Sequence, residues 1–246
     1  MRTPILMALV PVLLPLAACS GASFFSGDDG VAATGSGSSR SFAVADFTGV
    51  SLRGSDDVSV TLAATFSVRA EGPSEVLDRL KIERDGDMLK IGRKSDPSFN
   101  WGSFKGAKIF VTLPRLTSAN VAGSGDMTVA AAEGDSFEAS NAGSGSIAIA
   151  ALKVKSADFN IAGSGEISAK GSADKLKIAI AGSGDIDVAG VKASSADASI
   201  AGSGSVRADV NGPATVQILG SGDVDMGSNA TCTTSKLGSG SVTCGK

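Results

Sequence analysis

Acidic side chains recur at one position of a repeated pattern in the second half of this 246-residue sequence. The four acids that directly follow a Gly-Ser-Gly triplet are Asp126, Glu166, Asp185 and Asp223. Carboxylates stacked on neighbouring strands repel one another unless water or a cation separates them. Only Glu166 and Asp185 belong to consecutive repeats, so the row could bind calcium or could form a solvated acidic face. We favour the solvated face and predict no metal site.

The sequence offers no convergent set of side chains for catalysis. It contains no His, which removes His-dependent triads, His-ligated zinc and the commonest general base. An inverting glycosidase needs paired carboxylates with aromatic rings to hold the sugar, whereas the acids here are scattered. The 22 basic and 25 acidic residues leave no clustered positive charge for nucleic acid. We therefore expect no enzyme activity, no cofactor and no nucleic-acid partner.

One dense aromatic spot stands out in a chain that is 4% aromatic. Phe99, Trp101 and Phe104 lie in a stretch rich in Ser, Gly and Asp. These side chains could form a platform for a ligand such as a sugar. They could instead form a lid over the open end of a stacked coil, which must hide its core, and we favour the lid.

Two cysteines lie at matching positions around the last triplet. Cys232 comes six residues before its first glycine and Cys244 six residues after it. In an oxidising compartment this placement predicts a disulfide that closes the terminal coil. Two buried thiols are the alternative.

The N-terminus has the features of an export signal. Residues 1–18 combine Arg2 with a short apolar run that is too interrupted to span a membrane. The run ends in Leu-Ala-Ala before Cys19, which resembles a bacterial lipoprotein signal with Cys19 as the lipidated N-terminus; an ordinary secretory signal is the alternative. Ser20 resembles an outer-membrane address. Residues 19–41 read as a lipid-anchored, flexible Gly/Ser-rich linker.

The Gly-Ser-Gly triplet occurs seven times at intervals of 18 to 20 residues, which predicts one supersecondary unit per copy. Its first glycines are Gly123, Gly143, Gly163, Gly182, Gly202, Gly220 and Gly238. Positions two and four before this glycine, and four and six after it, are mostly apolar. Positions five before and three after are polar in every copy. Even positions therefore point inward and odd positions outward, which is the period of a β-strand.

The alternation passes through the triplet without a change of phase. The triplet is therefore expected to bend a continuing strand path, and glycine suits a narrow interior. Each unit then comprises a strand, a glycine corner, a strand and a turn of four to eight residues. We predict an all-β protein, a parallel β-helix with seven GSG-containing coils over residues 115–246. An antiparallel meander with a hairpin at each triplet is the alternative.

Residues 42–114 precede the array as a short β-rich N-terminal segment of the solenoid body. Val, Ile, Phe and Thr alternate along several short stretches, which predicts strands. Asp85-Gly86-Asp87 predicts a turn between two of them. Residues 73–78 begin with Pro73 and predict one helical turn.

Several motifs recur in a characteristic order along residues 42–246. They are Phe47-Thr48-Gly49-Val50, Asp57-Val58-Ser59-Val60, Leu89-Lys90-Ile91, Val111-Thr112-Leu113-Pro114 and the serial A-G-S-G-(D/S/E)-(I/V) units. This combination resembles the bacterial head GIN domain family, whose members are described as putative autotransporter adhesins. The resemblance implies an all-β solenoid on the cell envelope and no settled activity.

Three functions are compatible with these features. The first is a non-enzymatic cell-envelope lipoprotein that presents a β-helical surface for adhesion or for contact with an envelope protein or polysaccharide. The second is a carbohydrate-binding or carbohydrate-active module that uses the aromatic residues near Trp101. The third is a passive spacer. We favour the first, with the outer membrane as the expected location, and the sequence leaves the oligomeric state open.

Overall fold

The computed structural model describes residues 30–94 and 106–245, and nearly all of them lie in strands or tight bends. Its elements, in chain order, are β1 (Ala33–Thr34), β2 (Ser39–Phe42), β3 (Gly49–Gly54), β4 (Asp57–Leu62), β5 (Ser67–Glu71), α1 (Ser74–Leu77), β6 (Leu80–Asp85), β7 (Met88–Arg93), β8 (Lys108–Leu113), β9 (Ser118–Gly123), β10 (Met127–Val129), β11 (Ala132–Gly143), β12 (Ser146–Gly163), β13 (Glu166–Gly182), β14 (Asp185–Gly202), β15 (Ser205–Val210), β16 (Gly212–Gly220), β17 (Asp223–Asp225), β18 (Ala230–Leu237) and β19 (Val242–Thr243).

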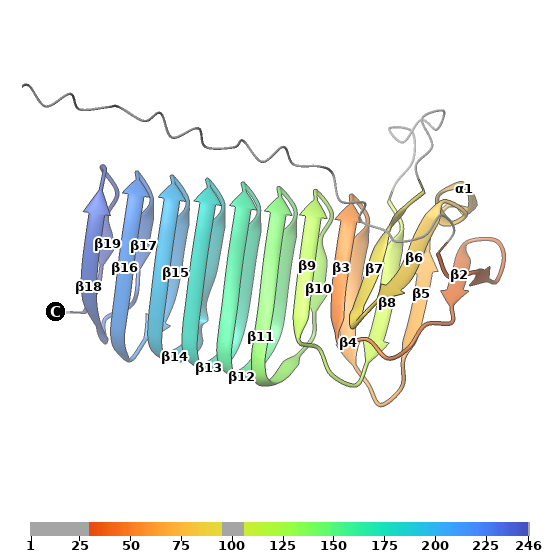
Figure 1. Cartoon of the computed structure of the whole chain (residues 1–246), viewed down its shortest axis with the longest axis horizontal. Coiled ribbons are helices and arrows are strands. Elements are labelled where there is room, and N and C mark those ends of the chain that lie inside the picture. The colour runs from red at the N-terminus through yellow and green to blue at the C-terminus, as the bar shows by residue number, and fades with distance from the viewer. Residues whose placement is uncertain (1–29, 95–105, 246) are drawn as a thin grey trace, which may run out of the picture.

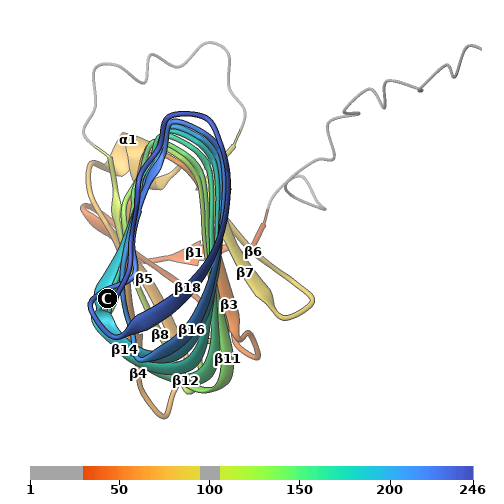
Figure 2. The same ribbon diagram turned by 90° about the vertical axis from the view of Figure 1, so that its left-hand side faces the viewer.

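The strands from β9 onward form a parallel solenoid. β11 pairs with β9 and β12, and β13 and β14 continue the stack, always in parallel. β15 to β19 extend it in the same way to the C-terminal end. The coils lie side by side in Figure 1 and superpose when viewed from the C-terminal end in Figure 2. The predicted all-β parallel β-helix is confirmed, and the parallel pairing excludes the meander.

The glycine triplets lie above one another along one edge of the solenoid, which the arrowheads mark in Figure 1. Gly163 is in register with Gly143 before it and with Gly182 after it. Its φ is +135°, and a Cβ atom here would come within 3.0 Å of the Gly143 backbone. Glycine is therefore required both for the backbone conformation and for the close approach of the coils.

In the central coils the predicted turn between one coil and the next is not a separate loop, whereas residues 226–229 between β17 and β18 lie outside the strands and include a turn. β12, β13 and β14 run unbroken for 17 or 18 residues from one corner to the next. Only register shifts interrupt the ladder, such as the one between Ile149 and Leu152. Parallel stacking explains the difference, because residues in the bend still pair with the equivalent residues of the next coil.

The array begins earlier in the chain than the triplets indicate. β3 pairs in parallel with β9, β4 pairs with β10, and Gly54 is in register with Gly123. β3 and β4 thus form a coil whose corner is Gly54-Ser55-Asp56. β7 and β8 pair with the other edges of β3 and β4. Residues 94–107 therefore connect β7 to β8. In the coils from β9 onward, a Gly-Ser-Gly triplet connects the equivalent strands.

Antiparallel strands and one short helix cover the N-terminal end of the solenoid. β5 pairs with β8, β2 with β5 and β6 with β7, which confirms the turn predicted at residues 85–87. α1 confirms the predicted helical turn and buries Val76 and Leu77. β1 and the first three residues of β2 lie within residues 19–41, which were expected to be linker. They belong to the body because β2 completes this antiparallel sheet.

Side chains alternate between interior and solvent as the parity predicts, and Ile147, Phe159 and Ile161 of β12 are all buried.

One buried polar residue breaks the pattern. Asn141 is 1% exposed at a position where its neighbours in register on either side are Val121 and Ile161. Its Nδ2 donates to Gly145 O at 2.5 Å, while its Oδ1 has no hydrogen-bond partner among the described residues.

Replacing Asn141 with valine is expected to stabilise the protein. Gly145 O keeps the backbone amide of Glu166 as a donor, and the change removes the unpartnered Oδ1 together with the Nδ2 hydrogen bonds to Gly145 O and Glu166 O. A buried acceptor without a partner costs about 1–3 kcal/mol, so we expect a gain of about 1 kcal/mol. Thermal unfolding of Asn141→Val beside Asn160→Val, an outward position, measures it. A lower melting temperature for Asn141→Val alone would show that the amide is needed.

Candidate interaction surface

One broad outer face of the solenoid carries polar side chains of varied type at its outward positions. We call it face A and define it by the outward positions of residues 118–122, 138–142, 158–162, 177–181, 197–201, 215–219 and 233–237. β12, β13, β14 and β16 contribute its centre. Five residues before each corner the side chain is polar in every coil, with charges at Glu138, Asp158, Lys177 and Asp197. One residue before the corner it is alanine in five coils and leucine in the last two.

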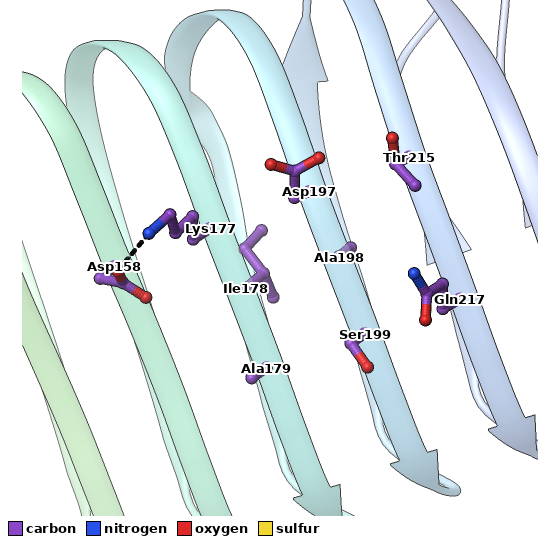
Figure 3. A pocket seen from close by; sticks show the side chains of 9 residues that line it. All are labelled: Asp158, Lys177, Ile178, Ala179, Asp197, Ala198, Ser199, Thr215 and Gln217. Carbon is purple, nitrogen blue, oxygen red and sulfur yellow. Dashed lines mark ion pairs between the residues drawn. The ribbon is translucent and has the colours of Figure 1, made fainter.

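A shallow hollow of about 380 Å³ lies at the centre of face A. Its floor includes Ala179, which lies in register between Asn160 and Ser199 and is smaller than both. The polar side chains that surround it in Figure 3 are Asp158, Lys177, Asp197, Ser199, Thr215 and Gln217. The hollow exists because a single methyl group interrupts a row of larger polar side chains.

Ion pairs hold the charged side chains around this hollow. Lys177 Nζ lies 3.6 Å from Asp158 Oδ2 on the preceding coil, as the dashed line in Figure 3 shows. Lys175 Nζ lies 2.7 Å from Asp197 Oδ2 on the following coil. All four side chains are about half exposed, so these pairs add little stability. They leave carboxylate, ammonium, amide and hydroxyl groups available to a ligand within one small area.

A second hollow of about 440 Å³ lies on the other broad face. It forms where the ladder shifts register near Ile149 and again near Ser168. Small side chains, among them Ala148 and Ala150, line it, and Lys170 and Asp187 contribute the charges. It contains fewer convergent polar groups than the hollow of face A.

Serine bridges three of the four acids in the row after the triplets, and only Glu166 and Asp185 stack acid on acid. Asp126 accepts hydrogen bonds from the Ser146 amide and hydroxyl, at 3.0 and 2.7 Å. Asp185 accepts the same pair of bonds from Ser205. Glu166 and Asp185 are in register, yet no metal-binding group of His, Cys, Asp or Glu is found among the described residues. Hydrogen bonds between coils account for the three aspartates of this row.

Asp223 is expected to titrate at an abnormally low pH. Hydrogen bonds from the Ser241 hydroxyl and amide hold its pKa below 3.8. The ionised form thus stabilises the fold above about pH 4, and this contribution is lost as pH falls through the lowered pKa. NMR titration should show the low pKa and its rise toward 3.8 in Ser241→Ala. An unchanged pKa in that variant would show that the hydroxyl plays no part.

Several residues singled out in the sequence lie outside the described part of the chain. These residues are Cys19, the expected lipidation site, and Phe99, Trp101 and Phe104, the expected lid or ligand platform. The lid and the platform therefore both stay predictions. Among the described residues, the N-terminal end is covered by α1 and the antiparallel strands.

Cys232 and Cys244 are joined in the structure, with Cα atoms 6.2 Å apart. Their bond closes the last coil across its corner. We expect unfolded Cys19→Ser protein to contain no free thiol without reductant, and Cys232→Ser with Cys244→Ser to lose about 3 kcal/mol of stability. Titration with a thiol reagent checks the first expectation, and two free thiols would contradict it.

Sequence reasoning missed one buried ion pair. Asp56 is fully buried at the corner between β3 and β4, where later corners have glycine. It accepts two hydrogen bonds from the Arg93 guanidinium, one of them 2.8 Å from Nε, and one from the Ala107 amide at 2.7 Å. Asp56 thereby connects Arg93 and Ala107, which lie at the two ends of segment 94–107. The sequence signal for this corner was Gly54-Ser55, which matches the first two residues of the Gly-Ser-Gly triplet.

A family model described as "Putative auto-transporter adhesin, head GIN domain" matches residues 46–230. The chain belongs to the head GIN domain family. The match begins between β2 and β3 and ends at the start of β18, so it includes β3 to β8 and α1 at the N-terminal end, the hollow of face A and most of the solenoid. A search of curated proteins finds no match.

Solved structures with this fold are similar over nearly their whole length. A putative adhesin from Bacteroides fragilis has 19% identity and a TM-score of 0.76, with 84% of this chain and 95% of that chain covered. A protein from Parabacteroides distasonis, titled a putative lipid binding protein, has 23% identity and a TM-score of 0.69, with 85% and 96% covered. A putative adhesin from Parabacteroides merdae has 18% identity and a TM-score of 0.60, with the same coverage.

These similarities show a shared fold for the head GIN domain described here. The adhesin description of the family suggests a protein of the cell envelope or cell surface, and it names no enzymatic activity. Among residues 30–94 and 106–245, no helix is long and apolar enough to cross a membrane.

Proposed function

We propose that this head GIN domain is the adhesive part of a non-enzymatic, lipid-anchored envelope protein, and that face A is its contact surface. The observation that carries the proposal is the hollow around Ala179, where donors and acceptors converge on a rigid, regularly spaced sheet. Stacked parallel coils hold these groups at fixed spacing, so little conformational entropy is lost when a ligand binds.

The chemistry of the hollow favours a hydroxyl-rich polymer as the ligand. Asp158 and Asp197 accept hydrogen bonds, Lys177 donates them, and Gln217 does both. A sugar hydroxyl is both a donor and an acceptor, and the Ala179 methyl offers a small apolar floor for a sugar ring. We therefore propose an envelope or host polysaccharide as the partner.

The proposed anchor is an acylated Cys19. The first described residues, Gly30 and Val31, lie against Ile82 of β6 at the capped end of the solenoid. An anchor eleven residues earlier would attach the protein by this end, with face A running away from the attachment point. Labelled fatty acid should be incorporated into the wild-type chain, and Cys19→Ser should leave the membrane fraction. Unlabelled wild-type protein would contradict the anchor.

Binding to an array of envelope and host glycans, with and without calcium, tests the adhesive role. Wild type is expected to bind, and Ala179→Arg, which fills the hollow, is expected to weaken binding at least tenfold, about 1.4 kcal/mol. Ala130→Arg adds the same charge to an exposed alanine outside both hollows and is expected to bind normally. Absence of binding by wild type would favour a protein partner or a spacer.

A further inference from the structure

The two ends of the solenoid are finished in different ways. Antiparallel strands and α1 cover the N-terminal end, whereas the C-terminal end consists of β18 and β19 themselves, as Figure 1 shows. Among the described residues, β18 pairs with β16 on one side, and its other edge has no strand partner. An unpaired edge of this kind is a template for another strand.

Inside the array, four coils use the second glycine of the triplet before them as an acceptor. Glu166 N donates to Gly145 O at 3.1 Å, and Asp185 N donates to Gly165 O at 3.0 Å. The coils that begin at Ser205 and Asp223 make the equivalent bond at 3.2 Å. In these four coils, the amide that follows the corner forms a hydrogen bond with the corner of the preceding coil.

Among the described residues, Gly240 is the last glycine of this series, and no backbone amide donates to its carbonyl. Instead Lys236 Nζ lies 2.6 Å from Gly240 O. The ammonium group therefore donates to Gly240 O. In four of the preceding coils, the equivalent carbonyl accepts a hydrogen bond from a backbone amide of the next coil. Asn141, at the same repeat position, makes the same bond to Gly145 O inside the array, which shows that a side chain here is well placed for it.

The inward positions of this last coil are polar where earlier coils are apolar. Lys236 is in register with Ile218, and Thr234 is in register with Val216. Both apolar partners are buried, whereas Lys236 and Thr234 are exposed at the open end. Stacking another coil on β18 would bury the ammonium group of Lys236 without a counter-charge from the coil before it, which is unfavourable.

We infer that Lys236, with Thr234, caps the open end and prevents a second copy of this chain from stacking on it end to end. A second copy fits this end because its own β18 has the same spacing and the same unpaired edge. Leu219 and Leu237, 58% and 72% exposed, adjoin this edge and would add apolar contact once the charge is removed. The cap keeps the protein as separate units.

Sedimentation velocity over a hundredfold range of concentration tests this inference, on chains carrying Cys19→Ser so that lipid plays no part. The parent chain is expected to stay monomeric. Lys236→Ile with Thr234→Val makes the last coil resemble the one before it, and we expect it to associate at least tenfold more strongly. The matched control is Lys192→Ile with Thr231→Val, which makes the same changes at exposed outward positions and should stay monomeric.

Negative-stain images of the associated variant should show particles of doubled length. A folded Lys236→Ile, Thr234→Val variant that stays monomeric would overturn the inference, as would side-by-side dimers or a parent chain that already pairs through β18. If this variant does not fold, Lys236→Met alone removes the charge with a flexible side chain. Circular dichroism establishes that it is folded, and the same outcomes then apply.

Discussion

Replacing Gly163 with alanine is expected to destabilise the solenoid by more than about 3 kcal/mol, although it adds one methyl group at the surface edge. Two costs combine at this position. The φ of +135° is strained for any residue with a Cβ atom, and the new methyl group would meet the Gly143 backbone. Neither coil can move away without breaking the parallel ladder on both sides. Thermal unfolding measures the loss.

Two other corner glycines separate these costs. Gly54 has a φ of +126° but open space around a Cβ atom, so Gly54→Ala should cost only the backbone strain, about 1–2 kcal/mol. Gly145 has no positive φ, yet a Cβ atom would collide with the Gly125 backbone, so Gly145→Ala should show the steric cost alone. Ser164→Ala, an exposed change in the same corner as Gly163, should be nearly neutral. Equal effects at Gly54 and Gly163 would contradict the close approach of the coils.

Removing the Asp56 carboxylate is expected to cost about 3–5 kcal/mol, the second largest effect. Asp56→Gly is the sharpest variant, because it turns Gly54-Ser55-Asp56 into a regular triplet. If the corner needed only small residues, this change would be neutral. We expect destabilisation instead, because Arg93 and the Ala107 amide both lose the acceptor that joins them.

Asp57→Ala is the matched control for that experiment. Asp57 is the next residue and also an acid, but its side chain is exposed at the start of β4. Its removal should change stability by less than about 0.5 kcal/mol. Hydrogen exchange should also show faster opening of β7 and β8 in Asp56→Gly alone. A wild-type melting temperature for that variant would mean that the ion pair does not hold the corner.

The sequence was most informative where one position repeats at constant spacing. Ile147, Ile167 and Ile186 could be predicted as inward because parity is unambiguous when the same residue type recurs. The turn after the second strand could not be predicted as continuous strand, because nothing local distinguishes it. Its structure depends on pairing with the coils above and below.

Three features needed the stacked arrangement to become visible. Gly54 and Gly123 are far apart in the sequence, since β5 to β8 intervene, so their common register leaves no periodic signal. Ala179 is unremarkable in sequence, and it forms a hollow only because the neighbouring coils place polar side chains beside it. Lys236 is visible as an exception to an apolar row. Its role depends on its hydrogen bond to Gly240 O at the end of the described coils.

Comparing Ala179→Arg with Trp101→Ala on one glycan array tests the central claim most directly. The claim is that face A, rather than the aromatic segment near Trp101, makes the adhesive contact. The account predicts that Ala179→Arg loses binding at least about tenfold, while Trp101→Ala binds like wild type. The reverse pattern, with binding abolished by Trp101→Ala and unaffected by Ala179→Arg, would contradict it and identify the aromatic segment as the ligand site.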